Sequence, residues 1–356
     1  MNEHTRILAE TVDRLFRDLI ADGQPRIEHS SKPKSMWDSV NELGIPNLFL
    51  PEEQGGFNGS WEEAYAVFSL LGYYAVPIPV GETIIAKKLL KDSEYSLFDA
   101  AIAPGSAREA SIEKDDTGQH WFTGTICALP WGRFSQSALI DCRHGDVEYR
   151  VLVSTDSAVT TQEDKNEADE PRDFLQFDRA PICELQQVDG DSAALFMGTA
   201  LLRTCQMAGA LQATLELCVQ YVLERKQFGR PIGKFQSIQH QLAILAEHCA
   251  AVDCAAQSAC RAYDKGNAPF EIAAAKLRAN RAVAEATSIA HQVHGAIGFT
   301  REHSLHYYTQ RLWSWRSECG NDRYWSEFLG KMVTNEGHEH LWPNMTARSD
   351  ARVSNT

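Results

Sequence analysis

One segment of the sequence, Glu224-Arg-Lys-Gln-Phe-Gly-Arg-Pro-Ile-Gly-Lys-Phe-Gln236, combines basic, aromatic and glycine residues in a way that suits a phosphate-bearing ligand. Arg225 offers a planar guanidinium that can bind a pyrophosphate through two parallel hydrogen bonds. Gly229 and Gly233 allow the backbone to approach a ligand closely, and the two phenylalanines could cover an apolar ring. An ordinary turn between helices, with solvated Lys and Arg side chains, is the alternative. Composition alone leaves both interpretations open.

The segments around this motif differ in composition and in the spacing of their apolar residues. Residues 1–95 carry apolar side chains at helical spacing, and a second helical zone covers 191–345 with long apolar stripes that favour an antiparallel bundle. Between them, 96–190 contains short β-branched and aromatic runs bounded by turn residues, which predicts a small β domain, and 346–356 is a polar tail. The expected elements are helices at 61–73, 81–90 and 271–294, strands at 121–128, 137–142 and 147–154, and a solvated loop at 156–172.

The bulk composition limits the partners and the compartment. The 356 residues are 44% hydrophobic and 23% charged, which is enough for folded domains with proper cores. A net charge of −14 disfavours nucleic acid and anionic membranes as partners. The cysteines are scattered without a CxxC pair, and His303 and His306 lack a third ligand, so we expect no metal site. Without an apolar leader or span in the sequence, we expect a cytoplasmic protein.

Several segments together resemble the acyl-CoA dehydrogenase family. The basic motif looks like its Arg-Lys-x-Phe-Gly signature followed by Ile and Phe-Gln. Glu42-Leu-Gly-Ile-Pro46 and Pro51-Glu-Glu-Gln-Gly-Gly56 resemble the N-terminal helical domain and its loop, and Gln292-Val-His-Gly-Ala-Ile-Gly-Phe299 resembles the Gln-x-x-Gly-Gly-x-Gly-Phe segment. The match covers nearly the whole chain. It implies an α+β multidomain fold with an N-terminal helical domain, a middle β-barrel-like domain and a C-terminal four-helix bundle.

The resemblance also implies that FAD lies between the β domain, the bundle and a second subunit. By position, the adenosine pyrophosphate would meet the basic motif, and Gln292, Gly295 and Ala296 would approach it from the partner subunit. The flavin ring would meet the strand that contains Ala128-Leu-Pro-Trp131. Ala296 replaces a usual glycine, and Ile102-Ala-Pro-Gly105 lacks the polar side chains of the family's Thr-Glu-Pro-Gly turn, so backbone groups or Ser135 would have to bind the ring. The implied cofactor-binding residues are Arg225, Gln227, Phe228, Ile232, Phe235, Gln236, Gln292, Gly295, Ala296, Leu129 and Pro130.

The family's reaction needs a carboxylate that removes the proton α to a thioester carbonyl, in a dry setting that raises its pKa. In Trp315-Arg-Ser-Glu-Cys-Gly-Asn-Asp322, an ungapped count from Phe299 places the base position on Cys319, and Glu318 lies one residue earlier. A second family location precedes an arginine that looks like Arg203, but Leu202 stands there. Glu318 is therefore the candidate catalytic base.

Three functions follow as hypotheses. The first is an FAD-dependent acyl-CoA dehydrogenase, of fatty acid or steroid side-chain catabolism, that passes electrons to an electron-transfer flavoprotein. The second is a non-catalytic subunit that completes FAD sites in a heteromeric α2β2 enzyme, because the carboxylate is displaced. The third is a flavin oxidase or monooxygenase on the same fold. The resemblance implies a homo-oligomer or a heterotetramer with a homologous subunit.

Overall fold

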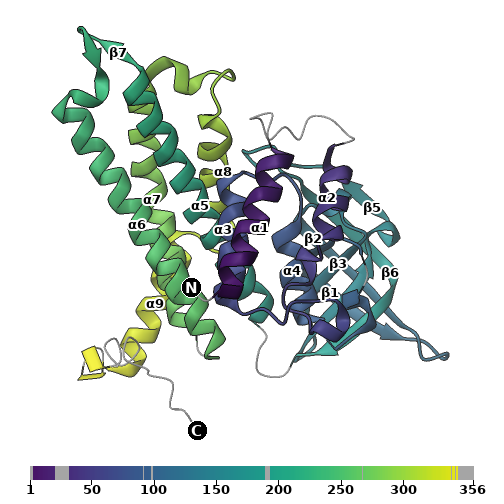
Figure 1. Ribbon diagram of the computed structural model, residues 1–356. Helices are drawn as coiled ribbons and strands as arrows, with labels where there is room; N and C mark the ends of the chain where they lie inside the picture. The colour runs from purple at the N-terminus through teal and green to yellow at the C-terminus, as the bar shows by residue number, and fades with distance from the viewer. Residues whose placement is uncertain are drawn as a thin grey trace.

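The computed structural model places the sheet on one side and the long helices on the other, with the N-terminal helices between them (Figure 1). It describes residues 3–20, 32–90, 92–97, 99–188, 193–266, 268–337, 339–340 and 342–343. The predicted polar tail at 346–356 lies outside these residues. The N-terminal helices, middle sheet and C-terminal helices confirm the predicted fold class.

The N-terminal helices are α1 (Glu3–Leu19), α2 (Lys32–Glu42), α3 (Trp61–Tyr73) and α4 (Val80–Leu89). Helix α3 begins where predicted because Ser60 and Glu63 form a reciprocal capping box, in which each side chain accepts a hydrogen bond from the backbone N–H of the other residue. Helix α4 is buried over most of its length because it packs on both the sheet and α5. It thereby connects the sheet to the bundle.

The sheet strands are β1 (Ile102–Lys114), β2 (His120–Pro130), β3 (Ser137–His144), β4 (Val147–Ser154), β5 (Thr160–Gln162) and β6 (Arg172–Gln187). Their order is β2-β1-β3-β4-β6-β5, and an additional β2–β6 pairing closes the sheet on itself as a barrel. Its interior is apolar, with Phe122, Ile140, Val151 and Phe177 buried. Closure leaves few unpaired strand edges.

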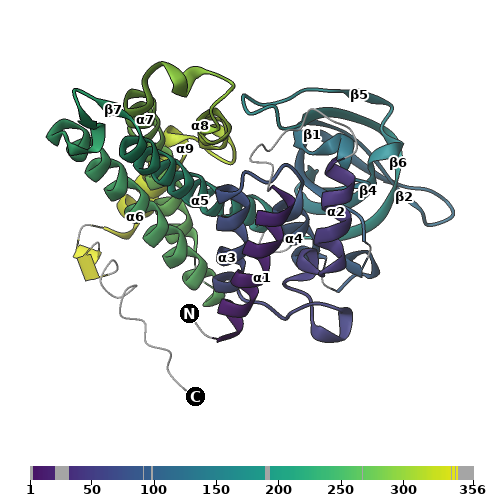
Figure 2. The ribbon, with the colours of Figure 1, turned by 45° about the horizontal axis from the view of Figure 1, so that its top comes forward.

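The C-terminal helices are α5 (Ala194–Glu224), α6 (Gln236–Asp264), α7 (Pro269–His294), α8 (Leu305–Ser317) and α9 (Asp322–Glu336). Between α5 and α6 a short hairpin, β7 (Lys226–Gln227) and β8 (Arg230–Pro231), projects from the end of the bundle that is farthest from the sheet (Figures 1 and 2). Helix α5 is buried almost all round its N-terminal half, because α3 and α4 cover the face that the other bundle helices leave free.

Two glycines let α3 and α5 approach closely. A Cβ added to Gly72 would lie 1.9 Å from the carbonyl oxygen of Gln206, and one added to Gly209 would lie 1.8 Å from that of Ser69. No side chain fits at either position, so the backbones of the two helices are in direct contact. This contact joins the N-terminal helices and the bundle into one core.

The expectation of a solvated loop at 156–172 holds for most of the segment, which is exposed, but it is wrong at the end of the segment. The segment contains strand β5, and its last residues are buried, with exposed fractions of 3% for Glu170 and 7% for Arg172. These charged side chains are buried because they pair with one another and with residues of the helical region, as described below.

Candidate functional site

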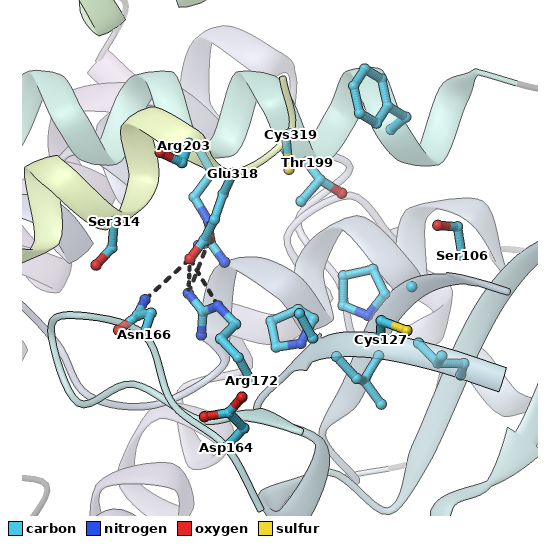
Figure 3. A pocket seen from close by; sticks show the side chains of 18 of the residues that line it. Ser106, Cys127, Asp164, Asn166, Arg172, Thr199, Arg203, Ser314, Glu318 and Cys319 are labelled. Carbon is cyan, nitrogen blue, oxygen red and sulfur yellow. Dashed lines mark hydrogen bonds and ion pairs between the residues drawn. The ribbon is translucent and has the colours of Figure 1, made fainter. Parts of the chain in front are cut away.

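A cavity of about 780 Å³ lies where the barrel meets the helices (Figure 3). Its barrel wall, from β1 and β2, is mainly apolar, and its helical wall, from α5 and the end of α8, is mainly polar. The β5–β6 loop closes a third side. Among its lining residues are Pro104, Gly105, Ile126, Leu129, Pro130, Asn166, Arg172, Leu195, Phe196, Thr199, Arg203, Trp313, Ser314, Glu318 and Cys319.

Both oxygens of the Glu318 carboxylate are held by side chains from three other segments. Arg172, at the start of β6, donates from Nε to Oε1 at 2.8 Å and from Nη2 to Oε2 at 3.0 Å. Arg203 of α5 donates from Nε to Oε2 at 2.8 Å, and Asn166 of the β5–β6 loop donates to Oε1 at 3.1 Å. Figure 3 shows these contacts converging on the carboxylate. Glu318 therefore connects the loop, the barrel and the bundle.

The two arginines belong to a larger buried ionic cluster. Arg203 lies 2.7 Å from Glu82 of α4, and Arg172 lies 3.0 Å from Glu170. Glu170 also faces Arg311 of α8 at 3.1 Å. With Glu318, three guanidinium groups face three carboxylates, so the cluster is neutral.

The cluster keeps Glu318 ionised. Burial alone would raise the pKa of this carboxyl, but the nearby guanidinium groups of Arg172 and Arg203 outweigh burial and lower the pKa to about 2. Its side chain is 21% exposed. Because its lone pairs are engaged and its affinity for a proton is low, Glu318 is a weak base in this arrangement.

The neighbouring thiol is also no base. Burial raises the pKa of Cys319 to about 11 despite the opposing effect of Arg203, so the thiol is protonated at neutral pH. Cys319 adopts a left-handed backbone conformation with φ 51°, and Gly320 follows at φ 95°. This turn directs the Glu318 side chain towards the arginines, while the Cys319 side chain lies beside Thr199 (Figure 3).

Comparison with known proteins decides the family. The model of the acyl-CoA dehydrogenase N-terminal domain matches residues 2–91, and the model of the C-terminal domain matches residues 192–321. The chain belongs to the acyl-CoA dehydrogenase family. The chain is 29% identical over 317 residues to the acyl-CoA dehydrogenase IpdE2 of Mycobacterium tuberculosis. The alignment covers 87% of this chain and 91% of that protein.

Solved acyl-CoA dehydrogenase-like structures share the fold. A chain of the ChsE4-ChsE5 complex from Mycobacterium tuberculosis matches with a TM-score of 0.83 at 20% identity, over 93% of this chain and 97% of that one. The structure described as PigA with FAD and proline matches with a TM-score of 0.76 at 16% identity, over 95% of this chain and 99% of that chain. Identities this low show the fold alone.

The site residues predicted for an acyl-CoA dehydrogenase fall into two separate groups. Leu129, Pro130 and Glu318 line the cavity. The remaining predicted residues lie on the hairpin after α5 or around the end of α7. From Thr199 in the cavity to Arg225 the chain follows α5 for 26 residues, about 39 Å at the helical rise. The hairpin therefore lies far from the cavity of its own chain.

The hairpin is exposed, and two of its polar side chains have no partner among the described residues. Phe228 is 89% exposed with a left-handed backbone (φ 51°), and its ring meets that of Phe235 edge to face. Within the described residues, the exposed side chains of Arg225 and Gln227 have no hydrogen-bond or ionic partner. Ile232 and Phe235 are half-buried at its base, where Gln236 begins α6.

A second groove of about 550 Å³ runs along α7 and α8 on the same end of the bundle. Gln292, Gly295 and Ala296 line it, and all three are exposed. Trp313 lines both this groove and the cavity, so the two hollows meet at its ring. The end of α7 packs on α5 where His294 stacks on Tyr221 at 4.7 Å, which places the groove near the hairpin.

Sequence reasoning missed Asn166, Arg172 and Ser314. Asn166 and Arg172 contact a residue about 150 positions later in the chain, a separation that no local pattern reports. Ser314 is 6% exposed, and its hydroxyl has no partner in the described structure although it lines the cavity. Ser135, considered for the flavin ring, is buried with an unpartnered hydroxyl and is absent from the cavity lining. No described helix has the length and apolar character that a membrane span requires.

Proposed function

We propose that this chain is an FAD-binding subunit of an enzyme that oxidises an acyl-CoA thioester between its α and β carbons and passes the electrons to an electron-transfer flavoprotein. The observation that carries the proposal is the cavity between an apolar barrel wall and a polar helical wall, on a chain of this family. FAD supplies the hydride acceptor when it is bound. The protein must exclude water, orient the thioester and remove one proton.

The exposed end of the bundle fits a flavin dinucleotide. Arg225 and Gln292 have side chains without partners among the described residues, and both are exposed. Gly229 and Gly295 have positive φ values, and a Cβ built at either would meet nothing within 4 Å, so the backbone there is open to a ligand. Phe228 offers an exposed ring. Charged donors, open backbone and an aromatic surface suit a pyrophosphate joined to flat rings.

The separation of the two groups supports a shared site. Because the cavity and the hairpin of one chain are about 39 Å apart along α5, we infer that FAD lies between the cavity of one chain and the hairpin and α7 end of another. The partner is a second copy or a homologous chain. Leu129 and Pro130 would contact the ring, and the partner copy's equivalents of Arg225 and Gln292 would contact the pyrophosphate.

A specific observation favours the non-catalytic subunit as the role of this chain. A base for the α-proton needs a free lone pair and a pKa near neutrality. Glu318 is tied to Arg172, Arg203 and Asn166, and its pKa is lowered to about 2. We therefore infer that turnover takes place in the cavity of a homologous partner that carries its own carboxylate, and that this chain completes the FAD sites.

The test is the visible spectrum of two preparations, the chain alone and the chain co-expressed with a homologous acyl-CoA dehydrogenase subunit. Each is titrated anaerobically with straight-chain, branched and steroid side-chain acyl-CoA thioesters. Flavin in the co-expressed preparation that a thioester bleaches, without bleaching in the chain alone, is the expected result. Bleaching of the chain alone would contradict the non-catalytic role, and loss of that bleaching in Glu318→Gln would identify Glu318 as the base.

Two further outcomes separate the remaining hypotheses. If both preparations lack bound flavin, the cofactor proposal itself is contradicted. Rapid oxygen consumption by the reduced protein, with no reduction of an electron-transfer flavoprotein, would assign the chain to the oxidase or monooxygenase alternative. Transfer to the flavoprotein, with slow oxygen consumption, is the result we expect.

A further inference from the structure

A buried lysine holds the turn that follows α8. Lys276 of α7 is 0% exposed, and its ammonium donates to the Asn280 side chain at 2.7 Å and to the carbonyl of Trp315 at 3.0 Å. The carbonyls of Gly320 and Arg316 lie at 3.3 and 3.4 Å. No carboxylate pairs with it in the described part of the chain. Its charge is therefore stabilised by neutral oxygen atoms.

The position of these oxygens explains the contact. An α-helix leaves its last carbonyls without intrahelical donors, and the negative end of its dipole attracts a cation. Trp315 and Arg316 are in the last turn of α8, which ends at Ser317. The Lys276 ammonium thus performs the task that backbone N–H groups perform at many helix C-termini.

The same turn is held at other points by side chains from outside α8. Asn280 donates to the carbonyl of Gly320 at 3.2 Å, and Trp325 donates from its indole to the carbonyl of Cys319 at 3.0 Å. The Glu318 carboxylate is held by the two arginines described above. Both the backbone and the acidic side chain of the turn are thereby fixed in place.

Keeping an ammonium at this position is costly. Burial lowers the pKa of Lys276 to about 8, although Cys319 and Glu318 partly oppose that effect. An apolar side chain of similar length would fill the same space without a desolvation penalty. The compensating gain is the set of bonds to the carbonyls of Trp315, Arg316 and Gly320, which flank the cavity-lining residues Ser317, Glu318 and Cys319.

We propose that Lys276 is a positioning residue, whose ammonium fixes the Glu318–Gly320 turn and with it the cavity wall formed by Glu318 and Cys319. The inference rests on the proposed function only in that this cavity receives the flavin ring and the thioester. The geometry of the turn can be measured without any cofactor.

The Cys319 thiol reports the position of the turn. We would compare native protein with Lys276→Met, and use Lys331→Met, an exposed lysine of α9, as the matched control. Alkylation with iodoacetamide over a range of pH, followed by peptide mass spectrometry, gives the rate per thiolate at each cysteine, which removes the effect of the Lys276 charge on the pKa of Cys319. Cys127 lines the same cavity and is exposed, so its rate normalises reagent access.

We expect Lys276→Met to raise the normalised rate at Cys319 by roughly tenfold to a hundredfold, the effect of losing a hydrogen bond to a charged group. The control should leave that rate unchanged. The buried Cys205 and Cys260 report general loosening of the bundle. A Cys319 rate within twofold of native in a folded variant would overturn the proposal, and so would an equal rise at all three cysteines.

A second variant covers the case in which Lys276→Met does not fold. Asn280→Ala removes one bond to the Gly320 carbonyl and the side-chain partner of the ammonium. We expect a selective rise of a few-fold at Cys319, and an unchanged rate would overturn the proposal. Failure to bind flavin would contradict the proposed function and leave this labelling result unaffected.

Discussion

Replacing Glu318 by glutamine tests whether this carboxylate is a structural anion or a catalytic base. Glutamine keeps the size of the side chain and one acceptor oxygen but removes the charge. Arg172 and Arg203 would then each keep only one carboxylate, Glu170 and Glu82 respectively. Removing one partner from a buried ionic cluster leaves uncompensated charge in a poorly solvated place, which is the costly way to alter such a cluster.

The expected loss of stability follows from the lowered pKa of Glu318. The fall from the ordinary value of 4.5 to about 2 corresponds to about 3 kcal/mol of stability at neutral pH. A carboxyl whose folded pKa is lowered contributes fully above 4.5, and the contribution is lost as the pH falls through about 2. By linkage, about 2 kcal/mol of it is gone at pH 3. Glutamine has no such dependence.

The assay is urea unfolding of native protein and Glu318→Gln at pH 7 and pH 3 in the same buffer, with the unfolding free energies compared as differences. We expect the variant to be less stable by about 3 kcal/mol at pH 7, and the gap to shrink to about 1 kcal/mol at pH 3. Equal stability at pH 7 would refute the structural reading. So would a gap that widens in acid, since a base with a raised pKa would produce that sign.

Three further predictions address the cofactor, the helix contact and the cavity. Arg225→Ala should weaken FAD binding by roughly tenfold to a hundredfold in a fluorescence titration, while Arg301→Ala, at an exposed turn, should not. Gly209→Ala should lower the unfolding free energy by about 1–3 kcal/mol because its methyl group would meet the α3 backbone, whereas Gly330→Ala, with nothing within 4 Å, should be neutral or stabilising. Cys319→Glu should give the isolated chain thioester-dependent bleaching, because a carboxylate in the cavity beside another carboxylate has a raised pKa; an unbleached, flavin-bound variant would count against this placement of the base.

The sequence predicted those elements whose signals are local. Helix α3 follows from its apolar spacing and from the Ser60 and Glu63 cap, and strands β3 and β4 begin where their β-branched runs begin. Strand β6 was not predicted at all, and its start is hard to recognise because Arg172 is charged and follows an acidic stretch. A buried ionic cluster and a solvated loop have the same composition, and only the tertiary partners distinguish them.

The candidate site illustrates the same limit. Glu318, predicted as the catalytic base, lines the cavity, but its chemistry depends on Arg172 and Arg203, which lie 146 and 115 residues away in the chain. The basic hairpin could be predicted because its residues are consecutive. That it is free of partners, and that it lies at the other end of the bundle from the cavity, required the structure.

In a shared cofactor site, the cavity of one chain and its hairpin and α7 end belong to different sites and can differ in function. In the proposed shared site, the hairpin and the α7 end would bind the cofactor of a neighbouring subunit, and the exposed side chains of Arg225 and Gln292 have no partners among the described residues. In the cavity of this chain, the Glu318 carboxylate belongs to a cluster in which three arginines balance three glutamates. A lowered pKa gives stability and removes basicity by the same interaction. Stabilising contacts at Glu318 and proton abstraction by it are therefore alternatives, and in this chain the contacts favour stability.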